Sequence, residues 1–280
     1  MELSKTQVDR LGQRLKDGSH TEDDLRLLDE YRRSFAAAYE IVAGTLRKRG
    51  ALPTGRLAKS TLSIVEKLRR ESIRLSQMQD IAGCRVIVRD VLEQDRFVAG
   101  LKIDFPELIV SDRRETPSHG YRAVHVIVKM SGKLIEIQVR TVLQHLWAEV
   151  SEKSSDVLDP TIKYGGGEPL WQDFLTKCSK SVASFEEFEK THTETVELGK
   201  VADASFERFE GFVARMRGEP LPEPMLKEYE TLLERLAREK KRRAQGDKAS
   251  AKRLAKLRKV NSDLLTKAIA RLDQRKGQHK

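Results

Sequence analysis

The clearest alternation of apolar and polar positions lies between residues 117 and 141. Successive side chains of a strand point to opposite faces, so residues 133–140 divide into two rows. The apolar row contains Ile135, Ile137 and Val139; the polar row contains Glu136, Gln138 and Arg140. Residues 123–128 alternate in the same way, with three valines on one face and His125 on the other. Met130-Ser-Gly-Lys133 has the composition of a tight turn. The pattern predicts a β-hairpin with one core-facing side, although an ordinary half-exposed sheet shows the same alternation.

Helical periodicity predicts most of the other elements. Residues 1–50 are expected to be helical, with a break at Gly18-Ser19 and a capped helix that continues to Arg49. Its apolar stripe is a core face: Tyr31, Phe35, Tyr39 and Val42. Residues 50–55 are expected to form a loop. Further helices are predicted over residues 56–70, 91–103, 142–153 and, as one or two helices, 168–217.

Two further strands and a second candidate loop complete the core. An Ile- and Val-rich strand follows Asp80, and Gly83 within it indicates a bend or a close backbone approach. A shorter strand is predicted over residues 107–111. Residues 159–167 form a loop that ends in three glycines. Such a loop can present backbone N–H groups to a phosphate, or it can be a flexible connection after a helix; both interpretations stay open.

The positive charge is concentrated at the C-terminal end. The chain has 280 residues and a formal charge of +10, and residues 226–280 contain 18 Lys or Arg against 7 Asp or Glu. The proline-rich segment 218–224 separates this tail, which is predicted to be a basic helix with a candidate interruption at Gly246. A concentrated basic segment attracts polyanions, but it can equally be a solvated helix face.

Other bulk features narrow the class of protein. No apolar run is long enough to span a membrane, and the charged N-terminus is unlike a signal peptide, so we expect a cytoplasmic protein without membrane contact. Cys84 and Cys178 are expected to be reduced packing residues rather than a disulfide or a metal pair.

Two features of residues 56–90 favour phosphate chemistry. Lys59, Ser63 and Lys67 fall at i, i+4 and i+8 of the predicted helix, so they could hold a polyphosphate or simply form a solvated face. Asp80 precedes a strand, where a carboxylate can bind Mg²⁺ or can act only as a cap.

The order of the motifs along the chain favours phosphate and metal binding over a solvated helix face and a simple cap. Gly120-Tyr-Arg-Ala-Val-His125 followed by Glu136-Ile-Gln-Val-Arg-Thr141 closely resembles the synthetase domain of the RelA/SpoT family, the alarmone synthetases. The Lys59–Lys67 segment and Asp80-Ile-Ala-Gly-Cys-Arg85 resemble its ATP-binding helix and its metal-binding motif. Arg56 stands one residue out of the usual register with Lys59.

The resemblance implies a fold, an activity and a site. It implies an α+β, nucleotidyltransferase-like fold with a mixed, mostly antiparallel sheet flanked by helices, and here a helical C-terminal extension. The expected domains are N-terminal helices (1–50), a catalytic core (51–167), a helical extension packed on the core (168–217) and a basic helical tail (218–280). The expected activity is transfer of pyrophosphate from ATP to the ribose 3′-hydroxyl of GDP or GTP, giving (p)ppGpp.

The implied roles of individual residues follow from the matched motifs. ATP would be bound by five residues: Arg56, Lys59, Ser63, Lys67 and Arg85. Asp80 and Glu136 would bind Mg²⁺, and Glu136 would also be the base for the 3′-hydroxyl. The acceptor would contact four residues: Tyr121, which would stack on its base, with His125, Gln138 and Arg140.

The sequence leaves the acceptor open. Family members usually have a Pro-Lys pair shortly before the Gly-Tyr, but Pro117-Ser-His119 has no lysine. A toxin-type member would pyrophosphorylate the 3′ end of tRNA and have an antitoxin partner, and the basic tail could lie on RNA or a ribosome. A degenerate, non-enzymatic RNA-binding protein is a third alternative. None of the six histidines is followed by Asp, so we expect no hydrolase half of the kind found in long family members.

Overall fold

The computed structural model describes residues 3–216 and 223–278. These residues form two compact units, one built from residues up to 179 together with those from 275 onward, and one from residues 180–274. The division falls inside a helix, between Ser179 and Lys180. The domain boundaries expected at residues 51 and 168 remain predictions, and most of the proline-rich segment 218–224 lies outside the described residues.

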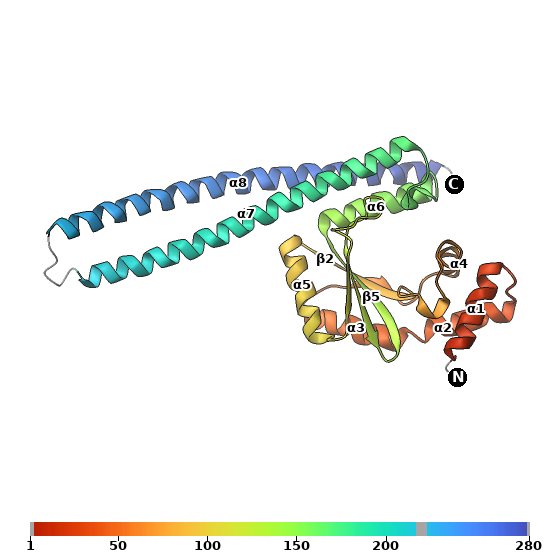
Figure 1. The fold of residues 1–280 in the computed structure, drawn as a ribbon. Helices are drawn as coiled ribbons and strands as arrows, with labels where there is room; N and C mark the ends of the chain where they lie inside the picture. The colour runs from red at the N-terminus through yellow and green to blue at the C-terminus, as the bar shows by residue number, and fades with distance from the viewer. Residues whose placement is uncertain (1–2, 217–222, 279–280) are drawn as a thin grey trace. The chain divides into compact units, whose positions relative to one another are not determined.

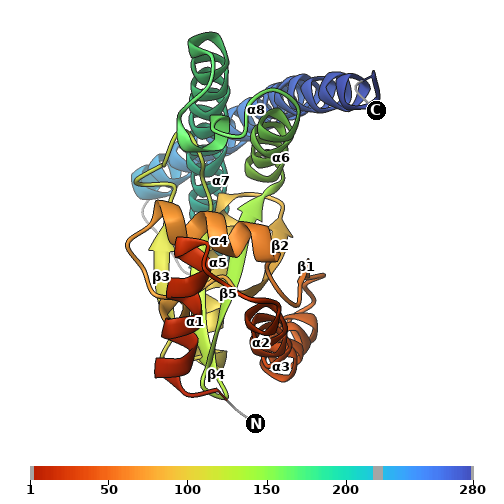
Figure 2. The same ribbon diagram turned by 90° about the vertical axis from the view of Figure 1, so that its right-hand side faces the viewer.

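The first unit contains a five-stranded sheet with the order β1-β2-β5-β4-β3 (Figures 1 and 2). The strands are β1 (Thr54–Arg56), β2 (Ala82–Val88), β3 (Ile109–Asp112), β4 (Val124–Met130) and β5 (Lys133–Thr141). Three neighbouring pairs are antiparallel, and β2 with β5 is parallel. The predicted α+β class with a mixed, mostly antiparallel sheet is therefore confirmed.

The hairpin of β4 and β5 has the predicted faces. Ser131 and Gly132 both have positive φ, 49° and 75°, which suits a two-residue turn whose twist matches that of the strands. The valines of β4 and the apolar row of β5 are buried in the core. His125 pairs with Gln138 across the strands, on the opposite face.

Helices α3 (Ala36–Lys48) and α5 (Val91–Asp104) contact the central strands, and α3 contributes to one core with the apolar side of the sheet. The helix predicted to continue to Arg49 is in fact broken at Ser34 and Phe35 into α2 (Glu22–Arg33) and α3. The Ser34 hydroxyl donates a hydrogen bond to the carbonyl oxygen of Tyr31 at 2.6 Å and competes with helix continuation there. The predicted apolar stripe is nevertheless buried.

The segment before β2 differs from the prediction. Residues 54–56 form edge strand β1, where a loop and the first turn of a helix were expected, and α4 (Thr61–Arg70) begins five residues later than predicted. Ser60 caps α4 by accepting a hydrogen bond from the backbone N–H of Ser63. Gly55 allows the pairing, because a Cβ there would lie 2.5 Å from the carbonyl oxygen of Gly83. Lys59 therefore precedes the helix and is not stacked on Ser63.

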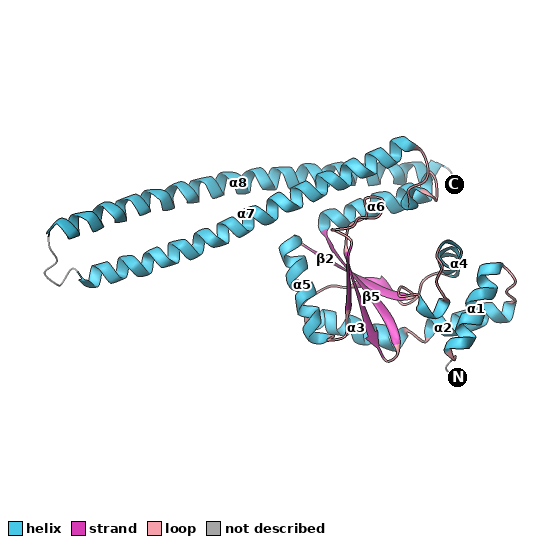
Figure 3. Cartoon of the chain, viewed as in Figure 1, coloured by secondary structure: helices cyan, strands magenta, loops and turns pink. Residues whose placement is uncertain are grey.

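Four further elements belong to this unit. They are α1 (Lys5–Asp17), the short 3₁₀ turns Leu75–Gln77 and Ile162–Tyr164, and α6 (Val142–Val157). Leu143, Trp147 and Val150 of α6 are buried, as its amphipathic pattern predicts. Figure 3 shows these helices around the strands.

The second unit is a pair of long antiparallel helices, α7 (Pro169–Met216) and α8 (Glu223–Gln278), within residues 180–274. Ion pairs cross between them at residues 189 and 258, 203 and 243, and 207 and 240. The two residue numbers of each pair add up to nearly the same value, as expected for antiparallel helices. The expected interruption at Gly246 is absent, because α8 continues through it. None of the helices in the described ranges is both long and apolar enough to cross a membrane.

Candidate active site

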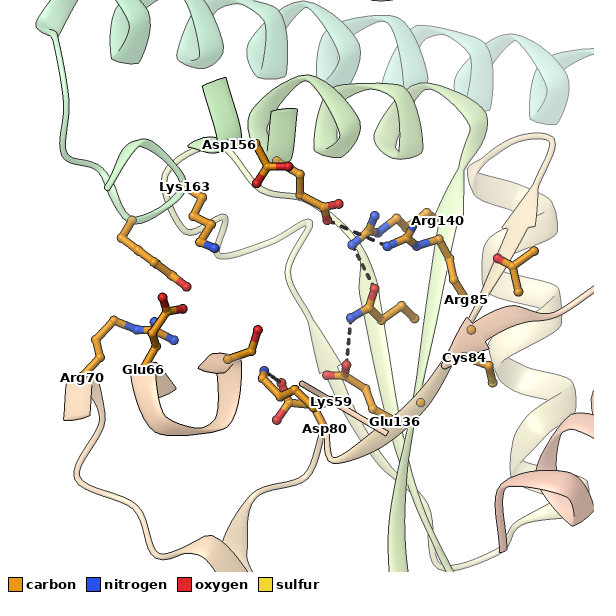
Figure 4. A pocket seen from close by; sticks show the side chains of 17 residues that line it. Lys59, Glu66, Arg70, Asp80, Cys84, Arg85, Glu136, Arg140, Asp156 and Lys163 are labelled. Carbon is orange, nitrogen blue, oxygen red and sulfur yellow. Dashed lines mark hydrogen bonds and ion pairs between the residues drawn. The ribbon is translucent and has the colours of Figure 1, made fainter. Parts of the chain in front are cut away.

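A cleft of about 630 Å³ opens on the polar side of the sheet (Figure 4). Its walls come from β1, β2, β5, the segment around α4, the C-terminal half of α6 and the loop of residues 159–167. Seven residues selected from the sequence line it: Lys59, Ser63, Asp80, Arg85, Glu136, Gln138 and Arg140. Lys67 reaches the same cluster through Asp80, while the side chain of Arg56 lies outside the described part of the structure.

Asp80 is held between two lysines. Its carboxylate oxygens lie 2.5 Å from Nζ of Lys59 and 2.9 Å from Nζ of Lys67. Burial acts to raise the pKa of Asp80, but the two ammonium groups outweigh it and hold this pKa below the ordinary value. The group is therefore an anion at neutral pH, and it fixes two cations at the wall of the cleft.

Five polar side chains form a closed ring of hydrogen bonds beside this cluster. Glu136 bonds His125 Nδ1 at 2.8 Å, and His125 Nε2 bonds the hydroxyl of Tyr121 at 2.8 Å. Arg140 donates to that hydroxyl at 2.8 Å and to Gln138 Oε1 at 2.9 Å. Gln138 Nε2 returns to the other oxygen of Glu136 at 2.8 Å.

The donors of the ring all point toward Glu136. Arg140 can only donate, so the oxygen of Tyr121 accepts, and its proton is directed to Nε2 of His125. A neutral His125 then carries its proton on Nδ1 and donates it to Glu136. Burial acts to raise the pKa of Glu136, but the hydrogen bonds from His125 and Gln138 overcome it, so the pKa is lowered. The ring stabilises an ionised carboxylate in a largely buried place.

Two arginines give the inner end of the cleft a strong positive field. Arg140 is 2% exposed, and its Nε and one terminal nitrogen have no hydrogen-bond partner. No carboxylate of the described residues lies within 4 Å of it. Arg85 Nε is also buried without a partner, and its nearest acid is Glu152 at 3.8 Å. Burial and the neighbouring Arg140 lower the pKa of Arg85. An anionic ligand would relieve this imbalance.

Tyr121 and His125 lie behind the cleft rather than on its wall, since neither lines it. They are joined to the wall residues only through the ring. The ring of Tyr121 has the guanidinium carbon of Arg140 5.0 Å from its centroid and meets His125 edge-on at 5.5 Å.

The cleft also contains residues that the sequence did not single out as ligands. They are Glu66 and Arg70 of α4, Glu152 and Asp156 of α6, and Lys163 and Tyr164 of the glycine-ended loop. Arg70 lies over the ring of Tyr164, 3.9 Å from its centroid. Arg70 continues the basic pattern of Lys67, so that pattern could have found it. The others depend on which distant segments face each other.

The three glycines of the loop are packed, and this argues against a flexible connection. Gly165 has φ +86°, and a Cβ there would overlap the ring of His119. Gly120, directly after His119, has φ +86° and lies against Trp147, where a Cβ would approach to 2.8 Å. Ser179 donates a hydrogen bond to the carbonyl oxygen of Gly120 at 2.6 Å. Residues 117–121, which precede β4, are therefore clamped on two sides.

The same close packing explains Gly83 of β2. A Cβ on this residue would lie 2.8 Å from the carbonyl oxygen of Glu136. The close backbone approach predicted for Gly83 is confirmed, and it allows Asp80, which precedes β2, and Glu136 of β5 to face one cleft.

Asp80 and Glu136 are the carboxylates that could hold a divalent metal. Across the described residues, no group of three or more His, Cys, Asp or Glu side chains is gathered as a metal site. Two carboxylates still fit Mg²⁺, which is commonly held by one or two carboxylates together with phosphate oxygens and water. The donor set contains only hard oxygen atoms, but both oxygens of Asp80 already accept from lysines.

Comparisons with known proteins give a consistent relationship. The family described as "Region found in RelA / SpoT proteins" matches residues 55–155. The chain is 34% identical over 131 residues to GTP pyrophosphokinase YjbM of Bacillus subtilis, covering 41% of this chain and 58% of that protein. It is 39% identical over 111 residues to Rv1366 of Mycobacterium tuberculosis, an uncharacterised protein, covering 38% and 41% of the two chains.

A solved structure is also similar. The small alarmone synthetase 1 from Bacillus subtilis, bound to its product pppGpp, aligns with a TM-score of 0.47 at 26% identity, over 63% of this chain and 99% of that one. The matched part covers 41% of Rv1366 and 58% of YjbM, which is less than two thirds of either curated relative.

Proposed function

We propose that the chain, whose residues 55–155 match the RelA/SpoT family, is an ATP-dependent pyrophosphotransferase that acts on GDP or GTP and forms (p)ppGpp. The observation that carries the proposal is the meeting, in one cleft, of a lysine-bound carboxylate, Asp80, and a ring-stabilised carboxylate, Glu136. Phosphoryl transfer depends mainly on positioning and electrostatics, and these two groups face the cations that a polyphosphate needs.

The nucleotide would be held by the wall that contains Asp80. Lys59 and Lys67 supply point charges, and Ser63 supplies a hydroxyl at the first turn of α4. Arg85 would contribute from β2, where its unpartnered Nε and nearby Arg140 favour an anion. We keep Arg56 as a proposed ligand from its sequence position alone.

Asp80 and Glu136 would bind Mg²⁺ with the phosphate oxygens. The ion, when bound, would neutralise charge on the β- and γ-phosphates and polarise the phosphorus that is attacked. Since Asp80 accepts from both lysines, binding of an ion there requires at least one ammonium group to move, and the phosphates offer that ammonium a new partner.

Glu136 would be the base for the acceptor. The 3′-oxygen forms a bond to the β-phosphorus of ATP, the bond from that phosphorus to the oxygen bridging to the α-phosphorus breaks, and AMP leaves. The 3′-hydroxyl proton passes to Glu136, whose lowered pKa keeps it ionised in the resting state. Gln138 and Arg140 lie on the same strand and would orient the acceptor.

From its sequence motif, we keep Tyr121 as the proposed stacking partner of the acceptor base; because Tyr121 does not line the cleft, its ring would have to become accessible when the acceptor binds. Arg140 lies over its ring at 5.0 Å, so a base would use the remaining face. Aromatic stacking of this kind contributes about 1–3 kcal/mol for each base. His125 would act through Tyr121 and Glu136, because it is joined to both and does not line the cleft.

A second candidate acceptor is the 3′ end of tRNA, as in a toxin with a separate antitoxin. The specific observation in its favour is the segment Pro117-Ser-His119. It contains no lysine for the 5′-phosphates of a nucleotide, and His119 packs against Gly165. The basic tail would then contact RNA or a ribosome.

The test is the fate of labelled pyrophosphate. The full chain is incubated with ATP labelled at the β- or γ-phosphate, Mg²⁺, and either GDP and GTP or bulk tRNA. Label in a guanosine nucleotide supports the first proposal, and label in tRNA without labelled nucleotide replaces it with the second. Label in neither, with ATP intact, would overturn both.

A further inference from the structure

The basic side chains of α8 fall into two groups. Residues 241–259 contain nine Lys or Arg and one acid, Asp247. Those turned toward α7 are neutralised: Arg243 pairs with Asp203 at 2.5 Å, and Arg258 pairs with Glu189. The outward-facing basic residues have no such partner.

Five exposed lysines form one row on the outward face: Lys241, Lys248, Lys252, Lys256 and Lys259. At about 100° per residue, four of them lie within about 20° of a common line, and Lys256 lies about 60° from it. We refer to them as the lysine row. It extends for about 27 Å at a rise of about 1.5 Å per residue.

The lysine row is unneutralised in the described structure. None of its members makes a hydrogen bond or an ion pair, and the one acid that stands three or four residues from a member is Asp263, four residues after Lys259. Lys248, Lys252 and Lys256 instead follow one another at i, i+4 and i+8, where like charges destabilise a helix. A helix needing only solubility would normally intersperse acids here, as α8 does with Glu234 and Arg238.

We propose that the lysine row binds the phosphodiester backbone of a nucleic acid. A backbone presents one negative charge per about 3.4 Å of each strand, so a straight row of about 27 Å can face several phosphates at once. The intervening residues on this face are small or polar, among them Gln245 and Ala249, and no large apolar side chain lies among them to insert into a lipid surface. This inference does not depend on which acceptor the cleft uses.

The row recognises charge rather than sequence, because ammonium groups on flexible stems make point contacts to phosphate oxygens. Binding should therefore tolerate any base sequence and weaken steeply with salt. Five neutralised phosphates on a duplex give a slope of log K against log salt of about −4.5.

The experiment is fluorescence anisotropy of the full chain with a labelled RNA duplex at several salt concentrations. The test variant is Lys248→Gln/Lys252→Gln/Lys256→Gln, which preserves side-chain length and helix propensity. The matched control is Lys5→Gln/Lys48→Gln/Lys102→Gln, which removes the same charge from exposed lysines elsewhere. Circular dichroism checks that both variants retain their helices.

We expect the test variant to bind about tenfold or more weakly and its salt slope to shrink by about three, while the control changes little. A duplex DNA of the same sequence distinguishes the two possible sources of the phosphodiester. Equal weakening by both variants would show that net charge alone is responsible. No binding to either duplex at low salt, or binding only to anionic phospholipid vesicles, would also overturn the inference.

Discussion

The polar face of the sheet and the outward face of α8 both contain several charged side chains. Those on the sheet have hydrogen-bonding or ionic partners, whereas the lysine row on α8 has none among the described residues. On the sheet, Glu136 accepts from His125 and Gln138, and Asp80 accepts from two lysines. On α8, none of the five lysines of the row makes an ion pair with an acid of the described residues. The first region fixes the direction and protonation of each group, whereas the second only accumulates charge.

The difference indicates what each region can recognise. Directed hydrogen bonds in a partly buried cleft can hold one geometry and tune a pKa, as a catalytic step requires. Exposed lysines attract any polyanion and are screened by salt. Substitutions should therefore have sharp, position-dependent effects in the cleft and graded, additive effects on α8.

The largest effect is expected from Glu136→Gln. The amide keeps the shape of the side chain but cannot accept a proton or bind a cation as a carboxylate does. Loss of a general base typically lowers the rate by about 10²–10⁴-fold. The measurement is pyrophosphate transfer under saturating substrates, with thermal melting to confirm folding.

The exposed Glu107→Gln is the control for that substitution. If Glu136→Gln transfers pyrophosphate at the wild-type rate, Glu136 is not the base. The cleft would then not show the sharp, position-dependent effects that distinguish it from α8.

A pair of glycine substitutions should give opposite signs. Gly165→Ala places a Cβ on the ring of His119 at φ +86°, and strain of this kind costs about 1–3 kcal/mol. Gly246→Ala lies in α8 with nothing within 4 Å and should stabilise its helix by about 0.5–1 kcal/mol. Thermal melting measures both effects.

Gly165→Ala should also raise KM for the acceptor more than KM for ATP, because His119 lies two residues before Tyr121. Equal stability of wild type and Gly165→Ala would show that the contact with His119 is not a constraint.

Substitution of His125 should move the pH dependence of kcat/KM. His125→Leu removes a donor to Glu136, so burial then dominates and the pKa of Glu136 rises. In the wild type, the lowered pKa keeps Glu136 ionised to lower pH. When the pKa of Glu136 rises, the acid limb of the profile moves to higher pH. His125→Asn retains an N–H near Nδ1 and should shift the limb less; identical limbs in all three proteins would contradict the role of the ring.

The smallest effect is expected from the ion pairs that cross between α7 and α8. The side chains of Lys240 and Glu207 are 39% and 64% exposed. Exposed pairs of this kind contribute about 0–1 kcal/mol. Glu207→Gln should therefore lower the melting temperature slightly at low salt and not at high salt. A large drop in melting temperature would show that the pairing of α7 with α8 depends on this ion pair, and would contradict the prediction.

The helices and the hairpin could be predicted where the pattern of apolar and polar residues within one segment determines its secondary structure. Alternation along residues 123–140 assigned both faces of β4 and β5, since a shift by one residue would expose the whole apolar row. The helix predicted from Arg56 was wrong in its first turn because pairing with β2 overrides the helical preference of residues 56–60. Ser34 breaks a helix by donating a hydrogen bond to the carbonyl oxygen of Tyr31, which periodicity does not reveal.

For the site residues too, the sequence did not predict which distant segments come together. Sequence order and family resemblance identified Asp80, Glu136 and most of their neighbours, but placed Lys59 on a helix that begins after it. Tyr164 and Asp156 were missed because helix and loop patterns do not say which distant wall they face. The sequence allows the loop of three glycines to be a phosphate-binding loop or a flexible link, and its contact with His119 depends on a segment about 45 residues earlier.

By itself, the sequence determined which side chains share a face and where charge accumulates, because strand and helix periods are set by the backbone of each segment. Only the tertiary structure decided that Lys59 and Lys67 meet on Asp80, and that Tyr121 and Arg140 close a ring with Glu136. These relations join residues from separate segments, and only the packing of those segments brings their polar atoms within hydrogen-bonding distance.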